Sequence, residues 1–205
     1  MRRANRVAAV AFTIGGSLFA LGAAEAQLGS GNAAAAASIY FAGGLFFNTG
    51  AYASLLGVVN RSPGPWRWWS YEPERMDWTS AFVLFAGTLA FGVSLGSSFL
   101  DGLTTHQQDR LIWTPEVVGC VLFLVSGRLA LTEVRRRRRR DLAWWIASIN
   151  QLGSILFMIS ALAGFIRPAT SSEINVAVAN WGTLSGALCF AVAGVLQGFD
   201  RPAPQ

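Results

Sequence analysis

The stretch INQLGSILFMIS, residues 149–160, places a phenylalanine four residues after Gly153 and a small residue seven residues after it. The spacing G-x-x-x-F occurs once in each of six hydrophobic blocks and nowhere else. Random placement of 22 glycines and 14 phenylalanines would give only about 1.5 such pairs. The pattern therefore indicates one structural element used six times. Its pairs are Gly15 and Phe19, Gly43 and Phe47, Gly87 and Phe91, Gly119 and Phe123, Gly153 and Phe157, and Gly186 and Phe190.

The motif marks one face of a helix, because positions i, i+4 and i+7 lie on the same side. The residue seven after each motif glycine is small in all six blocks: Gly22, Gly50, Ser94, Ser126, Ser160 and Ala193. In lipid, helices associate through close packing, which small residues permit. The pattern predicts that a phenylalanine ring of one helix packs over the glycine of its neighbour. The alternative is a permeation path lined by the glycines.

The composition is that of a membrane protein. Hydrophobic residues make up 53% of the chain and charged residues only 13%, against about 25% charged residues in soluble domains. Six apolar blocks reach or approach the roughly 20 residues that a membrane-spanning helix needs. We expect an all-α integral membrane protein, a single transmembrane domain of residues 1–205 with six helices. They are predicted at roughly 7–24, 33–59, 78–100, 113–134, 142–166 and 174–198.

The six helices are predicted to pair as three hairpins. Blocks 78–100 and 142–166 resemble each other, because Trp78 and Trp144 both stand nine residues before their motif glycine. Hairpins two and three enter from the same side, which makes them parallel internal repeats. The first block, flanked by MRRANR and AEAQ, also resembles a secretory signal. Since it carries the complete motif, we expect it to be retained as the first helix.

Arginine placement predicts the orientation. All 16 basic residues are arginines, and cytoplasmic segments of membrane proteins are enriched in basic residues. With the N-terminus inside, thirteen arginines fall in inner segments and two, Arg110 and Arg167, in outer ones. Both termini are therefore predicted to be cytoplasmic. The absence of lysine and the many alanines and glycines indicate a GC-rich genome, so we expect a bacterial plasma membrane.

Two segments are expected to contact the inner membrane surface. The run Arg135–Arg140 is predicted to fix the topology and to attract anionic lipid; docking of an acidic partner or of nucleic acid is the alternative. We do not expect nucleic-acid binding, because the positive-inside bias already accounts for the run. The segment WRWWSY, residues 66–71, is predicted to lie along the interface, where indole rings are enriched. An aromatic ligand site is the other interpretation of that segment.

Three segments resemble a known family: GSILF at 153–157, VVGCVLFLVS at 117–126 and FAGGLFFNTG at 41–50 are similar to the G-S-x-x-F cores of YrhK-like membrane proteins. These are small bacterial proteins, often a single helical hairpin, with longer multi-hairpin members. The resemblance covers nearly the whole chain, most clearly 78–198, and implies a multi-hairpin membrane protein. The family has no assigned activity or site residues, so the resemblance implies no catalytic residues here.

The sequence contains no catalytic or metal-binding constellation. Its one histidine, His106, lies in the predicted outer loop GLTTHQQDR, and a zinc or haem site needs more ligands. Cys120 and Cys189 occupy packing positions within predicted helices, so we expect no disulfide. We therefore predict no enzyme, and neither a cofactor nor a metal.

Polar residues inside a bilayer are functional candidates by default. Asn48, Arg128 and Asn150 form the candidate intramembrane polar site, and Gln151 and Glu133 lie in the same inner half. Arg128 can extend to the inner headgroups. Asn48 is near mid-membrane, where an unpaired amide costs several kcal/mol. We expect it to have a polar partner, a side chain or backbone carbonyl on another helix.

Two functions fit these observations. The first is a structural or accessory membrane protein that assembles as a homo-oligomer or with a membrane partner, which the packing stripes favour. The second is a small-solute transporter or channel, which the repeated hairpins and polar groups favour. A pore should carry polar residues at matching positions of its repeats. Asn48, Arg128 and Asn150 stand at different offsets from their glycines, which favours the first function. A polar cavity enclosed by the helices would favour the second.

Overall fold

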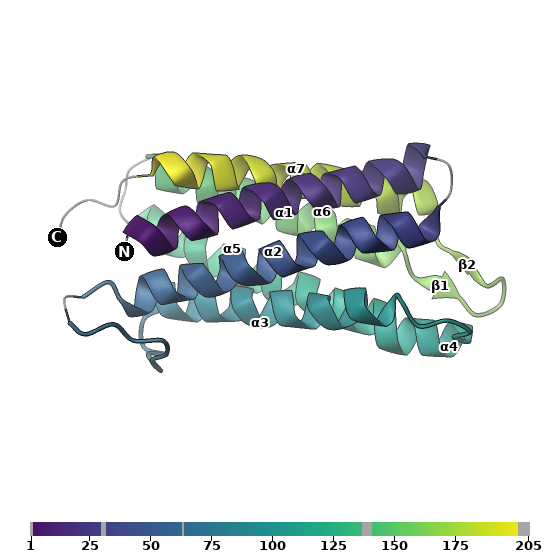
Figure 1. Ribbon diagram of the computed structural model, residues 1–205, viewed down its shortest axis with the longest axis horizontal. Helices are drawn as coiled ribbons and strands as arrows, with labels where there is room; N and C mark the ends of the chain where they lie inside the picture. The colour runs from purple at the N-terminus through teal and green to yellow at the C-terminus, as the bar shows by residue number, and fades with distance from the viewer. Residues whose placement is uncertain (1, 30–31, 63, 137–140, 201–205) are drawn as a thin grey trace.

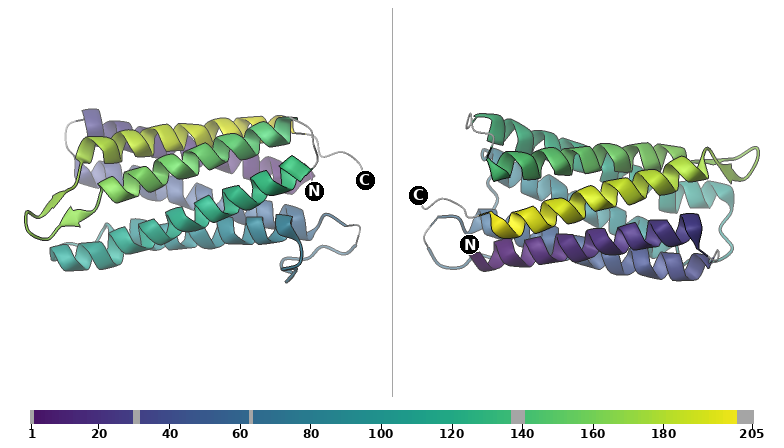
Figure 2. Two further views of the ribbon diagram at one scale, coloured as in Figure 1. Left: turned by 180° about the vertical axis from the view of Figure 1, so that it is seen from behind. Right: turned by 90° about the horizontal axis from the view of Figure 1, so that it is seen from above.

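The structure, a computed structural model, describes residues 2–29, 32–62, 64–136 and 141–200. Within these residues there are six long helices, which lie side by side along the long axis of the molecule (Figures 1 and 2). All six are long and apolar enough to cross a membrane, which confirms the predicted all-α membrane fold. They are α1 (Arg2–Leu28), α2 (Ala33–Val59), α3 (Met76–Ser97), α5 (Thr114–Arg136), α6 (Leu142–Ala163) and α7 (Val176–Phe199).

Short elements join the long helices at one end, which we call the distal end. A four-residue helix, α4 (Thr105–Gln108), continues through a π-helical turn, η1 (Asp109–Trp113), into α5. Two antiparallel strands, β1 (Ile166–Arg167) and β2 (Ser172–Glu173), connect α6 to α7. At the opposite end, the terminal end, α1 begins and α7 ends (Figure 1).

The prediction of a loop around His106 is wrong, because residues 105–113 are helical. Thr104 caps α4: its hydroxyl accepts from the backbone N–H of Gln107, whose side chain accepts from the backbone N–H of Thr104. This reciprocal capping box starts a helix in a segment too polar to be recognised as one. His106 itself is exposed on α4.

The long helices form a closed ring. α1 packs against α2, α2 against α3, α3 against α5, α5 against α6, α6 against α7, and α7 against α1. The pairs α1–α2, α3–α5 and α6–α7 are the three predicted hairpins. Their contacts, and those between α7 and α1, are more extensive than the other two. The ring therefore consists of three tight hairpins, with its first and last helices also tightly joined.

Each hairpin is held by two reciprocal contacts between a motif glycine and a motif phenylalanine. Phe47 of α2 lies over Gly15 of α1, while Phe19 of α1 lies over Gly43 of α2. The α3–α5 and α6–α7 pairs repeat the arrangement. A Cβ built on any of the six glycines would lie 2.6–3.1 Å from a carbon of the opposing ring, closer than van der Waals contact permits. The expected packing of ring over glycine is thus present in all three hairpins.

Contacts of α1 with α7 involve the backbone itself. A Cβ on Gly16 would lie 2.7 Å from the backbone nitrogen of Ala191 and 2.8 Å from the backbone oxygen of Ala187. At the terminal end, the Asn5 amide donates to the Gln197 backbone oxygen at 3.1 Å, and the Gln197 side chain donates to Asn5 at 3.0 Å. Small residues therefore let the first and last helices of the ring meet closely.

The six motif phenylalanines meet at the centre of the ring. One ring from each of α1, α3 and α6 forms a triangle with centroid separations of 5.8, 6.0 and 6.1 Å. The rings of α2 and α5 contact that of α7 at 5.5 and 6.1 Å. Such aromatic pairs contribute about 0.5–1.5 kcal/mol each beyond burial. The centre is therefore a packed aromatic cluster, and the motif glycines face neighbouring helices. The cluster consists of Phe19, Phe47, Phe91, Phe123, Phe157 and Phe190.

The connection between α2 and α3 folds against the terminal end through ion pairs. Asp77 pairs with Arg61 and with Arg75, and Glu72 pairs with Arg67 and with Arg75. The side chains of Trp66, Trp68, Trp69 and Tyr71 remain exposed. Exposed indoles beside a salt-bridged loop are the arrangement expected of an interfacial segment.

Candidate functional site

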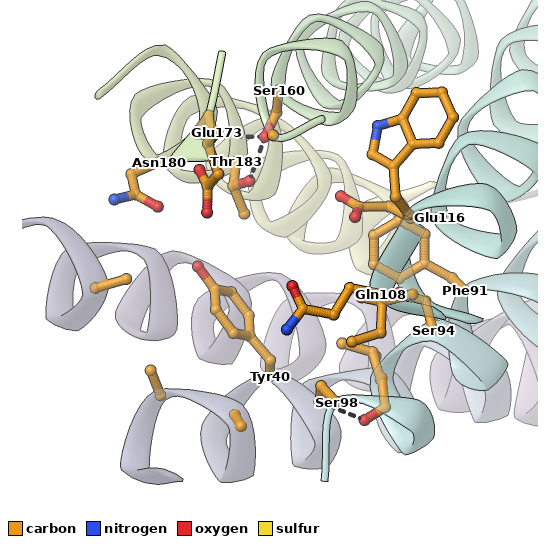
Figure 3. A pocket seen from close by; sticks show the side chains of 18 of the residues that line it. Tyr40, Phe91, Ser94, Ser98, Gln108, Glu116, Ser160, Glu173, Asn180 and Thr183 are labelled. Atoms are coloured by element: carbon orange, nitrogen blue, oxygen red, sulfur yellow. Dashed lines mark hydrogen bonds between the residues drawn. The ribbon is translucent and has the colours of Figure 1, made fainter. Parts of the chain in front are cut away.

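The distal end of the ring holds a cavity of about 460 Å³. Its wall comes from all six long helices and from α4, η1, β1 and β2 (Figure 3). Small-molecule sites typically occupy about 300–1,000 Å³ and combine apolar walls with a few polar groups. Polar side chains of this wall include Tyr40, Ser94, Gln108, Glu116, Glu173 and Asn180. Its size and lining are those of a small-molecule site.

Two carboxylates reach this cavity, Glu116 from α5 and Glu173 from β2 (Figure 3). They interact electrostatically, yet neither forms a hydrogen bond or salt bridge through its carboxylate within the described chain. Arg167 donates to the backbone oxygen of Glu173 at 3.4 Å and not to its carboxylate. Burial raises the pKa of Glu173 above its usual range. The cavity therefore concentrates acidic groups, and no arginine among the described lining residues compensates them.

Glu116 lies at the level of the cavity because the helical path that carries it begins about three turns earlier in the chain, at Thr105. The pair Thr114-Pro115 is typical of a helix start, but the helical path runs back through η1 to Thr105. Both the backbone N–H and the hydroxyl of Thr114 donate to the carbonyl of Asp109, five residues earlier. Pro115 has no N–H to donate and follows this π turn without breaking the helix. Glu116 thus lies within the continuous helical path, at the level of the cavity, and is half-buried there.

Several other polar groups of the wall are already paired. The hydroxyl oxygens of Ser160 and Thr183 lie 2.6 Å apart, and the Asn180 amide donates to Gln27 at 3.0 Å. The Tyr40 hydroxyl, in contrast, forms no hydrogen bond with any described residue. It faces the same space as the two carboxylates (Figure 3). One phenol and two carboxylates are therefore available to a ligand.

The aromatic cluster forms the floor of the cavity. Phe19 and Phe91 line it and also line a second void of about 10 Å³ beneath. That is close to the space that one water molecule needs. The cavity is thus separated from the centre of the ring by phenylalanine rings, and the Gly-lined path considered from the sequence is not present among the described residues.

The predicted polar site is not assembled, because Asn48, Arg128 and Asn150 lie on three helices and none lines the cavity. The Asn48 amide donates to the carbonyl of Gly44 at 3.2 Å. Its partner is therefore on its own helix and not on another, since an asparagine within a helix can bond to the carbonyl four residues back. The Asn48 Oδ1 atom is buried without a partner in the described chain.

The other predicted polar residues serve packing or face outward. Arg128 is exposed on α5. The backbone oxygen of Asn150 accepts a hydrogen bond from the Ser154 hydroxyl at 2.9 Å. Gln151 packs against Gly127 of α5, and its Oε1 atom is buried without a partner among described residues. No common site follows from these positions.

Asn48→Leu is expected to change the free energy of unfolding by less than about 1 kcal/mol, because it removes a buried unpaired oxygen together with one intrahelical hydrogen bond. Thermal unfolding in detergent measures the change. Thr49→Val is the matched control, since Thr49 also donates to a carbonyl four residues back on α2. A loss for Asn48→Leu several kcal/mol greater than for the control would show that Asn48 has a structural partner.

The sequence reasoning missed both cavity carboxylates. Glu116 had a signal, since it stands three residues before the motif Gly119 inside a predicted span, and ionisable groups in spans are site candidates. Glu173 had no such signal, because only the pairing of β1 with β2 places it in the cavity wall.

Comparison with known proteins gave no match: no family model, no curated protein and no solved structure is significantly similar to this chain. The resemblance to YrhK-like proteins therefore stays a prediction. The geometry of the cavity is the observation from which a function can be inferred.

Proposed function

We propose that this protein is a small-solute transporter that binds its solute in the distal cavity. One observation carries the proposal: a cavity lies where all three hairpins meet, and its two carboxylates have no partner among the described residues. Transporters built from repeats place their substrate sites at the interface between the repeats. Ionisable groups within membrane helices are expensive and usually serve function. The aromatic floor would then be the barrier that a transport cycle has to open.

A structural or accessory role is the second proposal. The motif glycines no longer favour it, because each is covered by a ring of the same chain. A shallow groove of about 310 Å³ between α1 and α7 does favour it, since it is lined by small residues such as Ala9, Thr13 and Gly198. Such a surface suits contact with a second copy or another membrane helix.

The protein is proposed to lie in a bacterial plasma membrane with its terminal end in the cytoplasm, so that the cavity faces outward. The arginine distribution supports this orientation. Arg135 is exposed at the terminal end, where anionic lipid would be its partner. Residues 137–140 of the basic run lie outside the described residues.

Cysteine labelling tests whether the cavity admits solutes. Ala37 of α2 lines the cavity and is half-buried, so Ala37→Cys adds little volume. It would be made with Cys120 and Cys189 replaced by alanine. The variant in lipid nanodiscs is expected to react with a water-soluble methanethiosulfonate reagent. In intact cells it is expected to react with a membrane-impermeant reagent, because the distal end faces outward.

Leu45→Cys, eight residues further along α2, provides the matched control. Leu45 is 55% exposed at a level where α2 faces lipid, so its thiol should stay unlabelled by a charged reagent. Equal protection of both thiols in nanodiscs would contradict a solute-accessible cavity. Labelling of Ala37→Cys in nanodiscs and in permeabilised cells, but not in intact cells, would instead contradict the orientation.

A further inference from the structure

We propose that the ligand of the distal cavity is a small organic cation, an alkylammonium ion whose charge lies between Glu116 and Glu173. This inference rests on the proposed solute-binding function and names its substrate class. The two carboxylates approach the same space from α5 and from β2 (Figure 3). A ligand between them would supply the positive charge that the described residues of the wall lack.

The charge balance of the wall favours a cation. Its two ionisable acids interact with each other, and no arginine lines the cavity within the described chain. Two like charges in a weakly solvated space are unfavourable. A bound cation would relieve this repulsion and satisfy both carboxylates at once, whereas an anion would add to the repulsion.

The aromatic part of the wall favours an organic ligand over a bare metal ion. Tyr40, Phe91 and Trp113 line the cavity, and aromatic faces attract ammonium groups with apolar substituents. Calcium and magnesium ions require about six oxygen ligands in close geometry. Among the described residues, no three His, Cys, Asp or Glu side chains come close enough to hold a metal.

The size of the cavity agrees with this class of ligand. About 460 Å³ exceeds the space of a single ion and lies in the range of sites for small organic molecules. The Tyr40 hydroxyl, which is unpaired within the described chain, can accept or donate one hydrogen bond to a polar group of the ligand. The ligand class is therefore a compact ammonium compound with one further polar group.

The charge of the cavity can be measured with a pair of thiol reagents. Ala37→Cys is treated at pH 7.5 with a cationic trimethylammonium-ethyl and an anionic sulfonato-ethyl methanethiosulfonate. The rate of reaction with the cationic reagent is divided by the rate with the anionic reagent, and this ratio is normalised to the same ratio for 2-mercaptoethanol. Both reagents attack the same thiolate, so its own ionisation cancels. One unit charge about 8 Å away at an effective dielectric constant of about 60 speeds the cationic reagent and slows the anionic one about threefold each, a factor of about ten in their ratio. From two carboxylates we expect a normalised ratio of about 100.

Removing either carboxylate should lower this preference. Glu116→Gln and Glu173→Gln, each combined with Ala37→Cys, are expected to reduce the normalised ratio about tenfold. Asp101→Asn removes an exposed carboxylate at the same end and is expected to change it by less than about twofold, since water and salt screen exposed charges. A ratio near one in the parent variant, or equal effects of all three substitutions, would overturn the proposal.

Protection by a ligand completes the test. Choline at millimolar concentration is expected to slow labelling of Ala37→Cys by the neutral reagent N-ethylmaleimide at least fivefold, and Glu116→Gln to abolish the effect. The uncharged isostere 3,3-dimethyl-1-butanol should not protect. Labelling without selective protection would overturn the cation assignment and leave the solute-binding function standing. Failure of every reagent to label Ala37→Cys would overturn the solute-binding function itself.

Discussion

Gly16→Leu is expected to cost at least about 3 kcal/mol and to lower the unfolding temperature in detergent by roughly 10 °C. The first added carbon would lie 2.7 Å from the Ala191 backbone nitrogen and 2.8 Å from the Ala187 backbone oxygen. Backbone atoms in a helix cannot rotate away as a side chain can. The two helices α1 and α7 would have to separate, and their other contacts would weaken with them.

Gly96→Leu is the matched control for this substitution. Gly96 is also in a helix, α3, but a Cβ there would meet no atom of the described chain within 4 Å. The same change of residue should therefore leave the unfolding temperature within a few degrees of the parent protein. If both variants unfold at the same temperature, the close approach of α1 to α7 does not contribute to stability.

Phe47→Ala is expected to cost about 3–5 kcal/mol, the usual range for a buried phenylalanine. Its ring is 5% exposed and contacts the rings of Phe12, Phe19 and Phe190 at centroid distances of 5.7, 5.2 and 5.5 Å. It also covers Gly15, so its removal leaves an empty space within a hairpin and at the centre of the ring. Size-exclusion chromatography after heating would measure the loss of folded protein.

The adjacent residue offers a control in the same turn of α2. Phe46 is 38% exposed and makes no ring contact with the described residues, so Phe46→Ala exchanges one lipid-facing apolar side chain for another. Its expected cost is below about 1 kcal/mol, because lipid tails solvate both residues. Similar losses from both variants would mean that the aromatic cluster does not hold the ring together.

The helices and their pairing could be predicted from local sequence because each helix carries its own packing signal. Gly153 and Phe157 lie on one face of α6, and Gly186 and Phe190 lie on the face of α7 that packs against it. The contact within a hairpin was therefore encoded twice, once in each helix. The same reasoning could not give the order of helices around the ring, because no residue pattern specifies which hairpin faces which.

The cavity could not be predicted, because it depends on how the hairpins are arranged around the ring and no residue pattern specifies that arrangement. Glu116 and Glu173 come together only because β2 folds back beside the helical path through η1. Glu116 stands three residues before its motif glycine, the offset that Tyr40 and Thr183 share in their own helices, so a search for matching polar positions at this offset could have found it. Glu173 lies in the connection between α6 and α7, outside the repeated helices, and such a search could not find it. For Asn48 the sequence predicted a contact that the structure lacks. Its position near mid-membrane suggested a partner on another helix, but its amide donates to the carbonyl of Gly44 on its own helix.

The reciprocal contacts of the hairpins have a consequence for the order of folding during synthesis. Each hairpin joins neighbours in sequence, so it can form as soon as its second helix leaves the ribosome. The contacts between α1 and α7 include a hydrogen bond between residues 192 positions apart. Such non-local contacts form late, because the long intervening chain must first be ordered. The α1–α2 hairpin therefore has to wait in the bilayer, with the face that α7 will cover still in lipid, until the last helix arrives.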